Sequence, residues 1–214
     1  MQIRAIRLTP WIVALMLVAS GAARAGTKVE NCTGSGSAVS IPVDMDNDSC
    51  FTASTGATVC TGSSGYANLS GECSPGGRFT AQGLVEWDPV PGSGCNIAGT
   101  TVPGIATCTM AGSSEQGCEL QLVGASAVSR DTVSGDLTFL SYSTDSRLCV
   151  DLSSGPPFDF ISSYKATITG GTGKNAGASG TLMGGDHGQL LTFDAAGHGL
   201  SWAESTFTET ITTN

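Results

Sequence analysis

Residues 158 to 168 read FDFISSYKATI, and this stretch decides the fold class. Its apolar and aromatic residues fall at alternate positions: Phe158, Phe160, Tyr164, Ala166 and Ile168. Successive side chains of a β-strand point to opposite faces, so these residues share one face. The sequence therefore predicts a half-buried strand over these residues.

The chain beyond residue 25 repeats this pattern in short runs. FTAQGLVEW, residues 79 to 87, places Phe79, Ala81, Val85 and Trp87 on one face, and no window carries an apolar stripe at helical spacing. Further strands are predicted at residues 38–43, 119–123, 136–144, 147–152, 188–194 and 200–212, separated by Gly, Ser, Pro and Asp turns. These segments predict an all-β protein, an eight-stranded antiparallel up-and-down barrel, with a β-sandwich as the alternative.

The N-terminus has the order of a secretory signal. Two arginines precede an apolar run from Trp11 to Ala19, and Ala23-Arg24-Ala25 offers a cleavage site. We expect cleavage near Ala25 and a secreted or periplasmic protein, with no cysteine at the cleavage point to carry a lipid. Cleavage would leave six basic against 18 acidic side chains, a formal charge of −12. Such a chain is repelled by nucleic acid and by anionic membranes, and no later run is long enough for membrane insertion.

Residues 26 to 77 differ from the rest of the mature chain. They are rich in Gly and Ser, and we expect an irregular extension, tied by disulfides and integral to the domain, with the barrel core over 78 to 214. All the cysteines lie beyond the signal, and their even number in an exported chain predicts disulfides whose pairing is open: Cys32, Cys50, Cys60, Cys73, Cys95, Cys108, Cys118 and Cys149. Spacing alone suggests hairpin-sized loops for Cys60 with Cys73 and Cys95 with Cys108.

ITGGTGKNAGASGT, residues 168 to 181, satisfies a dinucleotide-binding pattern through Gly171, Gly173 and Ala176. A phosphate site of that kind needs a helix after the glycines, because the helix N-terminus supplies free N–H groups. The glycines that follow oppose such a helix, and the residues do not fit a P-loop. We interpret the segment as a wide connection between strands, with glycines at positive φ.

The same segment resembles a family. Gly170-Gly171-Thr172-Gly173-Lys174 and the glycines after it are similar to a motif shared by allene oxide cyclase and dirigent-like barrels and by exported bacterial proteins of undefined role. Residues 79 to 87 and 148 to 151 also resemble the last group. The resemblance implies an eight-stranded barrel whose mouth accepts an apolar molecule. Asn175 stands where the family usually has Phe, and no catalytic residue can be carried over.

Two polar groups are candidate sites. His187 and His198 should lie near opposite ends of one strand, too far apart to share a ligand, so we assign neither a catalytic role. Asp44, Asp46 and Asp48 could converge on calcium, although the residues at positions 6 and 12 of that loop exclude an EF-hand. A weaker calcium loop and an acidic solvated turn remain open, and no other cofactor is expected.

The sequence favours a non-catalytic binding or structural module whose partner is a small apolar molecule. Two alternatives are an isomerase or cyclase acting on an apolar substrate inside the barrel, and a surface or matrix component that assembles with copies of itself. Aromatic residues could line a pocket or simply fill the core: Trp87, Phe139, Phe160, Tyr164, Phe193 and Trp202. An enzyme would need an ionisable group in the cavity, and we expect Glu86 and Asp159 to face solvent instead.

Overall fold

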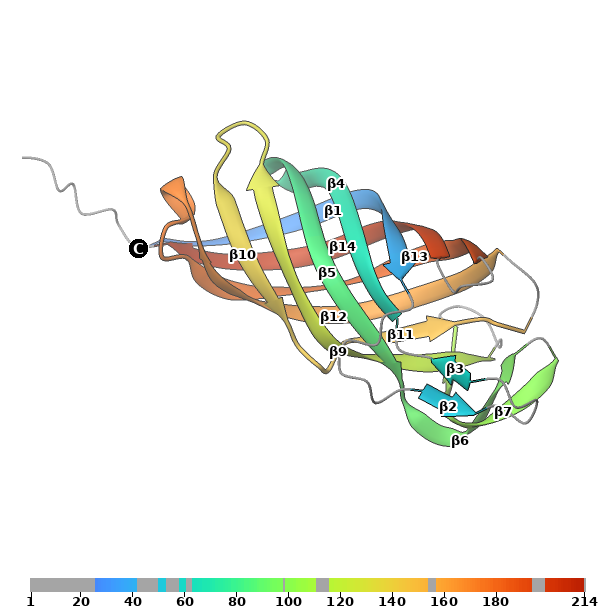
Figure 1. Ribbon diagram of the computed structural model, residues 1–214. Helices are drawn as coiled ribbons and strands as arrows, with labels where there is room; N and C mark the ends of the chain where they lie inside the picture. The colour runs from blue at the N-terminus through green and yellow to red at the C-terminus, as the bar shows by residue number, and fades with distance from the viewer. Residues whose placement is uncertain are drawn as a thin grey trace, which may run out of the picture.

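The computed structural model describes residues 26–41, 50–52, 58–60, 63–97, 99–110, 116–153, 157–193 and 199–213. These residues are almost entirely antiparallel β-strand (Figure 1). The strands of the main sheet are β1 (Gly26–Ile41), β4 (Ser63–Ser74), β5 (Gly77–Pro89), β9 (Gln116–Asp131), β10 (Leu137–Tyr142), β11 (Arg147–Val150), β12 (Phe158–Gly171), β13 (Ser179–Phe193) and β14 (Gly199–Thr213), with the short β8 (Thr107–Thr109) on β9. In the described residues no helix is long and apolar enough to cross a membrane.

The main sheet closes on itself. Each long strand pairs with the next along the chain, β10 and β11 together fill one position between β9 and β12, and β14 pairs back with β1. That last register runs from Gly26 opposite Thr213 to Ser40 opposite Gly199. The result is a ring of eight strand positions in up-and-down order, which confirms the expected fold class.

Alternation along each strand decides which side chains enter the ring. In β12, Phe160, Ala166 and Ile168 are buried, whereas Asp159 and Lys165 are exposed. One buried cluster within the ring comprises Leu140, Ala166, Ile168, Ala178, Leu182 and Ile211. Ile168 is only 1 % exposed, and burying an aliphatic side chain of this size contributes about 1.5 to 3 kcal/mol.

The expectation of an irregular extension at residues 26 to 77 is wrong for two long segments. Strands β1 and β4 belong to the ring, and together they pair with β14 and β5. Among the described residues of this part of the chain, the small hairpin of β2 (Cys50–Thr52) and β3 (Thr58–Cys60) stands apart from the main sheet. The ring is therefore built from strands on both sides of residue 77.

The disulfides also differ from the pairs suggested by spacing. Cys73 is bonded to Cys32, Cys95 to Cys118, and Cys108 to Cys149. In each pair the two cysteines come from different strands, so each bridge ties strands together. In the backbone register of β2 and β3, Cys50 lies opposite Cys60.

An insertion between β5 and β9 lies at the end of the ring opposite the C-terminus (Figure 1). It contains the hairpin β6 (Pro91–Ile97) and β7 (Thr100–Ile105), followed by β8. Two of the disulfides attach this insertion to β9 and β11. Its inner residues form a second buried cluster, in which Ile105 packs with Cys95 and Cys118.

The glycine-rich segment after β12 is a connection between neighbouring strands. It forms a single turn of 3-10 helix, η1 (Gly173–Asn175), before β13 begins at Ser179. Gly173 has φ 56° and Gly177 has φ 71°, a backbone region that glycine enters without steric cost. The proposed role of these glycines as strand connectors is confirmed.

Candidate functional site

The interior of the ring contains two cavities, which we call the apolar chamber and the charged chamber. The apolar chamber has a volume of about 520 Å³ and is lined by Trp87, Leu122, Phe160, Leu190 and others. The charged chamber, of about 270 Å³, is lined by residues that include Lys28, Glu30, Arg78, Asp131, Lys174 and Glu209. Leu69, Ala81, Tyr142 and Tyr164 line both, so the chambers meet at these four side chains.

The apolar chamber is walled by the ring and by the insertion. Leu120 and Leu122 come from β9, Phe160 from β12, and Ile97 and Ile105 from β6 and β7. Apolar side chains form most of the lining. Among the described residues that line it, Asp186 is the single carboxylate, and none is Lys, Arg or His.

Strand β13 places Asp186 inside the ring. Its inward positions are Leu182, Gly184, Asp186, Gly188 and Leu190, at every second residue. A Cβ atom at Gly188 would lie 2.7 Å from the tip of the Phe160 ring, and one at Gly184 would overlap the side chain of Phe207. The glycines on either side of Asp186 therefore admit phenylalanine side chains from the two neighbouring strands.

Hydroxyl groups from two neighbouring strands surround the Asp186 carboxyl group. The Ser162 hydroxyl donates to Asp186 Oδ2 at 2.9 Å, and the Asp186 backbone N–H donates to Ser162 Oγ at 3.1 Å. On the other side, Ser205 of β14 lies directly opposite Asp186. The hydroxyls of Ser205 and Tyr164 are 2.6 Å apart, and each is placed to donate to the Asp186 carboxyl. We call these four residues the Asp186 cluster.

Burial sets the electrostatics of the Asp186 cluster. It raises the pKa of Asp186, although hydrogen bonds from Ser205, Ser162 and Tyr164 oppose the shift. Burial also raises the pKa of Tyr164 far above its usual range, and the Asp186 charge adds to that effect. The neighbouring Tyr142, whose ring lies edge-on to Tyr164 at 5.8 Å, has its pKa raised to about 12 by burial and then by the charges of Asp186 and Glu209. The cluster can accept or hold a proton in apolar surroundings.

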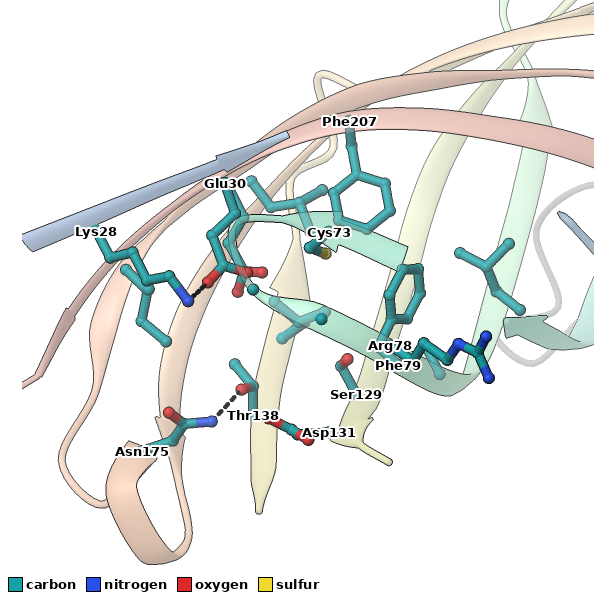
Figure 2. A pocket seen from close by; sticks show the side chains of 18 of the residues that line it. Lys28, Glu30, Cys73, Arg78, Phe79, Ser129, Asp131, Thr138, Asn175 and Phe207 are labelled. Carbon is teal, nitrogen blue, oxygen red and sulfur yellow. Dashed lines mark hydrogen bonds and ion pairs between the residues drawn. The ribbon is translucent and has the colours of Figure 1, made fainter. Parts of the chain in front are cut away.

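The charged chamber lies at the end of the ring where β1 begins and β14 ends (Figure 2). Glu30 and Glu209 stand opposite each other in the β1–β14 register, and Lys28 forms an ion pair with Glu30. Burial raises the pKa of Glu209 to about 7, the Glu30 charge adds to the shift, and Lys28 opposes it. Glu209 is therefore partly protonated near neutral pH.

The opposite wall of the charged chamber carries a second set of polar contacts. Lys174 Nζ lies 2.6 Å from Asp131 Oδ2. That hydrogen bond, with those from the backbone N–H groups of Ser134 and Val133, holds the pKa of Asp131 well below its usual range. Asn175 is buried and donates to Thr138 Oγ1 at 3.0 Å (Figure 2). The position where the resembled family usually has Phe is thus occupied by a hydrogen-bonded amide.

Among the described residues, one group of potential metal ligands lies at the charged chamber. Ligand atoms of Glu30, Glu209, Cys32 and Cys73 lie within 4.8 Å of one another. The two sulfur atoms are joined in a disulfide and cannot act as thiolate ligands. Two carboxylates beside a lysine remain, which is too few for a calcium ion that takes six to eight oxygens.

The aromatic residues considered as pocket lining differ in where the structure places them. Trp87, Phe160 and Tyr164 line the apolar chamber as that interpretation requires. The expectation for Trp202 is wrong, because it is 44 % exposed on the outward face of β14. Phe139 is partly buried and lines neither chamber, and the side chain of Phe193 lies outside the described residues.

Of the two carboxylates predicted to face solvent, one is exposed and the other is buried. Asp159 is exposed, as predicted, and accepts a hydrogen bond from Gln189 at 2.9 Å. The prediction for Glu86 is wrong: it is 6 % exposed and lies beside Gly124, but it lines neither chamber. Its burial therefore does not supply the ionisable group that an enzyme would need.

Of the remaining sequence candidates, the structure describes only His187. His187 is exposed on β13, opposite Glu204 of β14. His198 and the calcium candidates Asp44, Asp46 and Asp48 lie outside the described residues. The residue that sequence reasoning missed as an interior group is Asp186. The signal was its even spacing, four residues, from both Leu182 and Leu190, and it was obscured by the glycines at the inward positions between them.

Comparison with protein-family models, with curated proteins and with solved structures found no match to this chain.

Proposed function

We propose that this protein is an exported, disulfide-stabilised carrier that binds a small apolar molecule in the apolar chamber. The single observation that supports it best is a cavity of about 520 Å³ with a predominantly apolar lining and one polar cluster. Small-molecule sites are commonly clefts of about 300 to 1,000 Å³ that combine apolar walls with a few placed polar groups. In this proposal the Asp186 cluster fixes the polar end of the ligand.

Export is part of the proposal. Three disulfides are consistent with an exported protein, since such bonds persist in oxidising compartments. We propose that cleavage near Ala25 releases the chain to the periplasm or the medium. Its net negative charge then keeps it soluble and away from nucleic acid and anionic lipid.

A second candidate function is an isomerase or cyclase that acts on an apolar substrate in the same chamber. The observation that favours it is the contact of Asp186 with the Ser205 and Tyr164 hydroxyls. A carboxyl group with a raised pKa can exchange a proton with a substrate, and a tyrosine hydroxyl can donate to an oxygen that gains negative charge. Release of a rearranged product, identified by mass spectrometry, would replace the carrier proposal with this one.

Self-assembly is a further candidate, supported by an exposed apolar row on the outside of the ring. Leu84, Tyr66, Val39 and Leu200 are register partners across four neighbouring strands, and they are 39 to 56 % exposed. Contiguous exposed apolar surface often marks an interface. Light scattering coupled to size-exclusion chromatography tests it, and a strictly monomeric protein removes this candidate.

Native mass spectrometry of protein purified from its natural host, with and without a chelator, tests the carrier proposal. We expect a retained apolar ligand, and its mass should not depend on the chelator. Ala203→Phe should abolish ligand retention, because Ala203 lines the apolar chamber and a phenyl ring there occupies ligand volume. Thr206→Phe, on the exposed face of the same strand, is the matched control and should retain the ligand.

A ligand retained equally by Ala203→Phe and by the wild type would place binding elsewhere and overturn the carrier proposal. Cooperative thermal unfolding of both variants shows that the comparison is made between folded proteins.

A further inference from the structure

The apolar chamber contains a carboxylate that has no counter-cation. None of the ion pairs among the described residues involves Asp186, and no basic side chain lines that chamber. Two of the three basic residues that line the charged chamber form ion pairs at its own end, Lys28 with Glu30 and Lys174 with Asp131. The described partners of the Asp186 carboxyl are the hydroxyls of Ser162, Ser205 and Tyr164.

Hydroxyl groups satisfy the hydrogen bonds of a carboxylate but do not neutralise its charge. An ionised carboxylate in apolar surroundings is costly unless a cation pairs with it, and without one it takes up a proton instead. The raised pKa of Asp186 agrees with this environment. A ligand that brings its own positive charge would remove the penalty.

The aromatic side chains of the chamber suit the same kind of ligand. Trp87, Tyr142, Phe160 and Tyr164 line it, and the last two lie on the strand next to Asp186. Organic cations are attracted to aromatic faces within about 6 Å, most strongly where water is excluded. A chamber that combines one carboxylate, several aromatic rings and aliphatic walls matches an ammonium group attached to an apolar body.

We propose that the apolar chamber selects a small organic ammonium ion, with its charged nitrogen against the Asp186 cluster and its apolar part against the aliphatic and aromatic walls. The proposal rests on the carrier function and specifies the class of ligand. A metal ion is a poor occupant, because one carboxylate and a few hydroxyls fall short of the oxygen ligands that calcium or magnesium takes. A carboxylate or phosphate ligand would be repelled by Asp186.

Three probes of equal length test the charge preference: octylammonium, octanol and octanoate, with binding measured by isothermal titration calorimetry near pH 7. Alkylamines titrate in the range of the lysine side chain and are protonated there. We expect octylammonium to bind at least about tenfold more tightly than octanol, because only the cation pairs with the buried charge, and octanoate to bind more weakly than octanol.

Asp186→Asn keeps the volume of the side chain and removes its charge. It should bring octylammonium to within about twofold of octanol and leave octanol affinity unchanged. Asp159→Asn, on the exposed face of neighbouring β12, is the matched control and should bind all three probes like the wild type.

The possible failures are distinguishable. If no probe binds and Ala203→Phe changes nothing, the chamber is not a binding site and the carrier function itself fails. If octanol binds the wild type as tightly as octylammonium while Ala203→Phe blocks both, the carrier function stands and the ammonium proposal is overturned.

Proton release gives a second readout that uses the wild-type chain. At the acidic pH values where Asp186 is partly protonated, an ammonium ion that pairs with it should displace the proton. Calorimetry in two buffers of different ionisation enthalpy measures this release. The carboxylates of the charged chamber, Glu30, Asp131 and Glu209, are also present in Asp186→Asn, so the proton count of that variant is the reference. Tight binding of octylammonium with the same proton count in wild type and Asp186→Asn would overturn the placement.

Discussion

Asp186 of β13 and Ser205 of β14 stand directly opposite each other inside the ring, and Ser205 also lies 2.6 Å from the Tyr164 hydroxyl. Three neighbouring strands thereby place one carboxyl and several hydroxyl groups at a single point of an otherwise apolar chamber. Ser205 is 2 % exposed, so the hydrogen bonds of this cluster are made within the protein and their loss should be measurable.

Tyr164→Phe removes one hydroxyl from the cluster and keeps the ring. We expect a loss of about 1 kcal/mol in the free energy of unfolding, because Ser205 loses a buried partner. The pKa of Asp186 should rise further, since the Tyr164 hydrogen bond lowers it. Urea denaturation and NMR titration of the Asp186 carboxyl carbon measure the two effects. Tyr66→Phe, on the outer face and 39 % exposed, should change neither.

Glu209→Gln should change how stability depends on pH. The folded protein holds the pKa of Glu209 at about 7 against an ordinary value of 4.5, so the folded state binds the Glu209 proton more tightly than the unfolded state. Its stabilising contribution is complete below about pH 4.5 and is lost as the pH rises through about 7. The loss amounts to up to about 3 kcal/mol in the free energy of unfolding.

Urea denaturation over a pH series checks this prediction. Glu209→Gln should flatten the decline between about pH 4.5 and pH 7, and Glu204→Gln, exposed on the same strand, should leave it in place. An unchanged decline in Glu209→Gln would overturn the assignment of this pH dependence to Glu209.

The disulfide at the insertion should matter for the apolar chamber as well as for stability. Replacing Cys95 and Cys118 by Ser opens a bridge with a sequence separation of 23 residues, which corresponds to about 3 kcal/mol of stability. Ligand affinity should also fall, because Cys118, Ile97 and Ile105 line that chamber. Replacing Cys32 and Cys73, which lie toward the other end of the ring, should lower stability by about 4 kcal/mol and leave affinity intact.

At the charged chamber, the neutral hydrogen bond of Asn175 should contribute more to the free energy of unfolding than the ion pair of Lys174. Asn175→Ala leaves the buried Thr138 hydroxyl without its amide donor, at a cost of about 1 to 2 kcal/mol. Lys174→Ala breaks the ion pair with Asp131, but Lys174 is largely exposed, and such pairs contribute about 0 to 1 kcal/mol. Thermal unfolding of the two single variants decides the order.

Alternation of apolar residues was sufficient to predict the fold where the inward side chains are large. In residues 79 to 87 and 158 to 168 it identified which side chains share a face, and Trp87 and Phe160 do enter the ring. It could not say which face is inward, since that depends on the curvature of the closed sheet. In β14, alternation placed Trp202 and Glu204 on one face but could not show that this face points outward.

The pattern failed where the inward side chains are small. In β1 and β4 the strands approach so closely that a Cβ at Gly36 would overlap the carbonyl oxygen of Asn68, and one at Gly71 that of Thr33. Glycine is required there by the packing, yet it carries no hydrophobic signal. Asp186 was missed for a related reason, because Gly184 and Gly188 occupy the inward positions beside it.

The pairing of β1 with β14 has a consequence for the order of events in the cell. Gly26 meets Thr213, so the first strand of the ring to be synthesised stays without one neighbour until the last has been made. Contacts of such high sequence separation form slowly. The ring can therefore close only after β14 is available. With the export proposed above, a chain that crosses the membrane unfolded would complete its ring on the far side, in the compartment where disulfides persist.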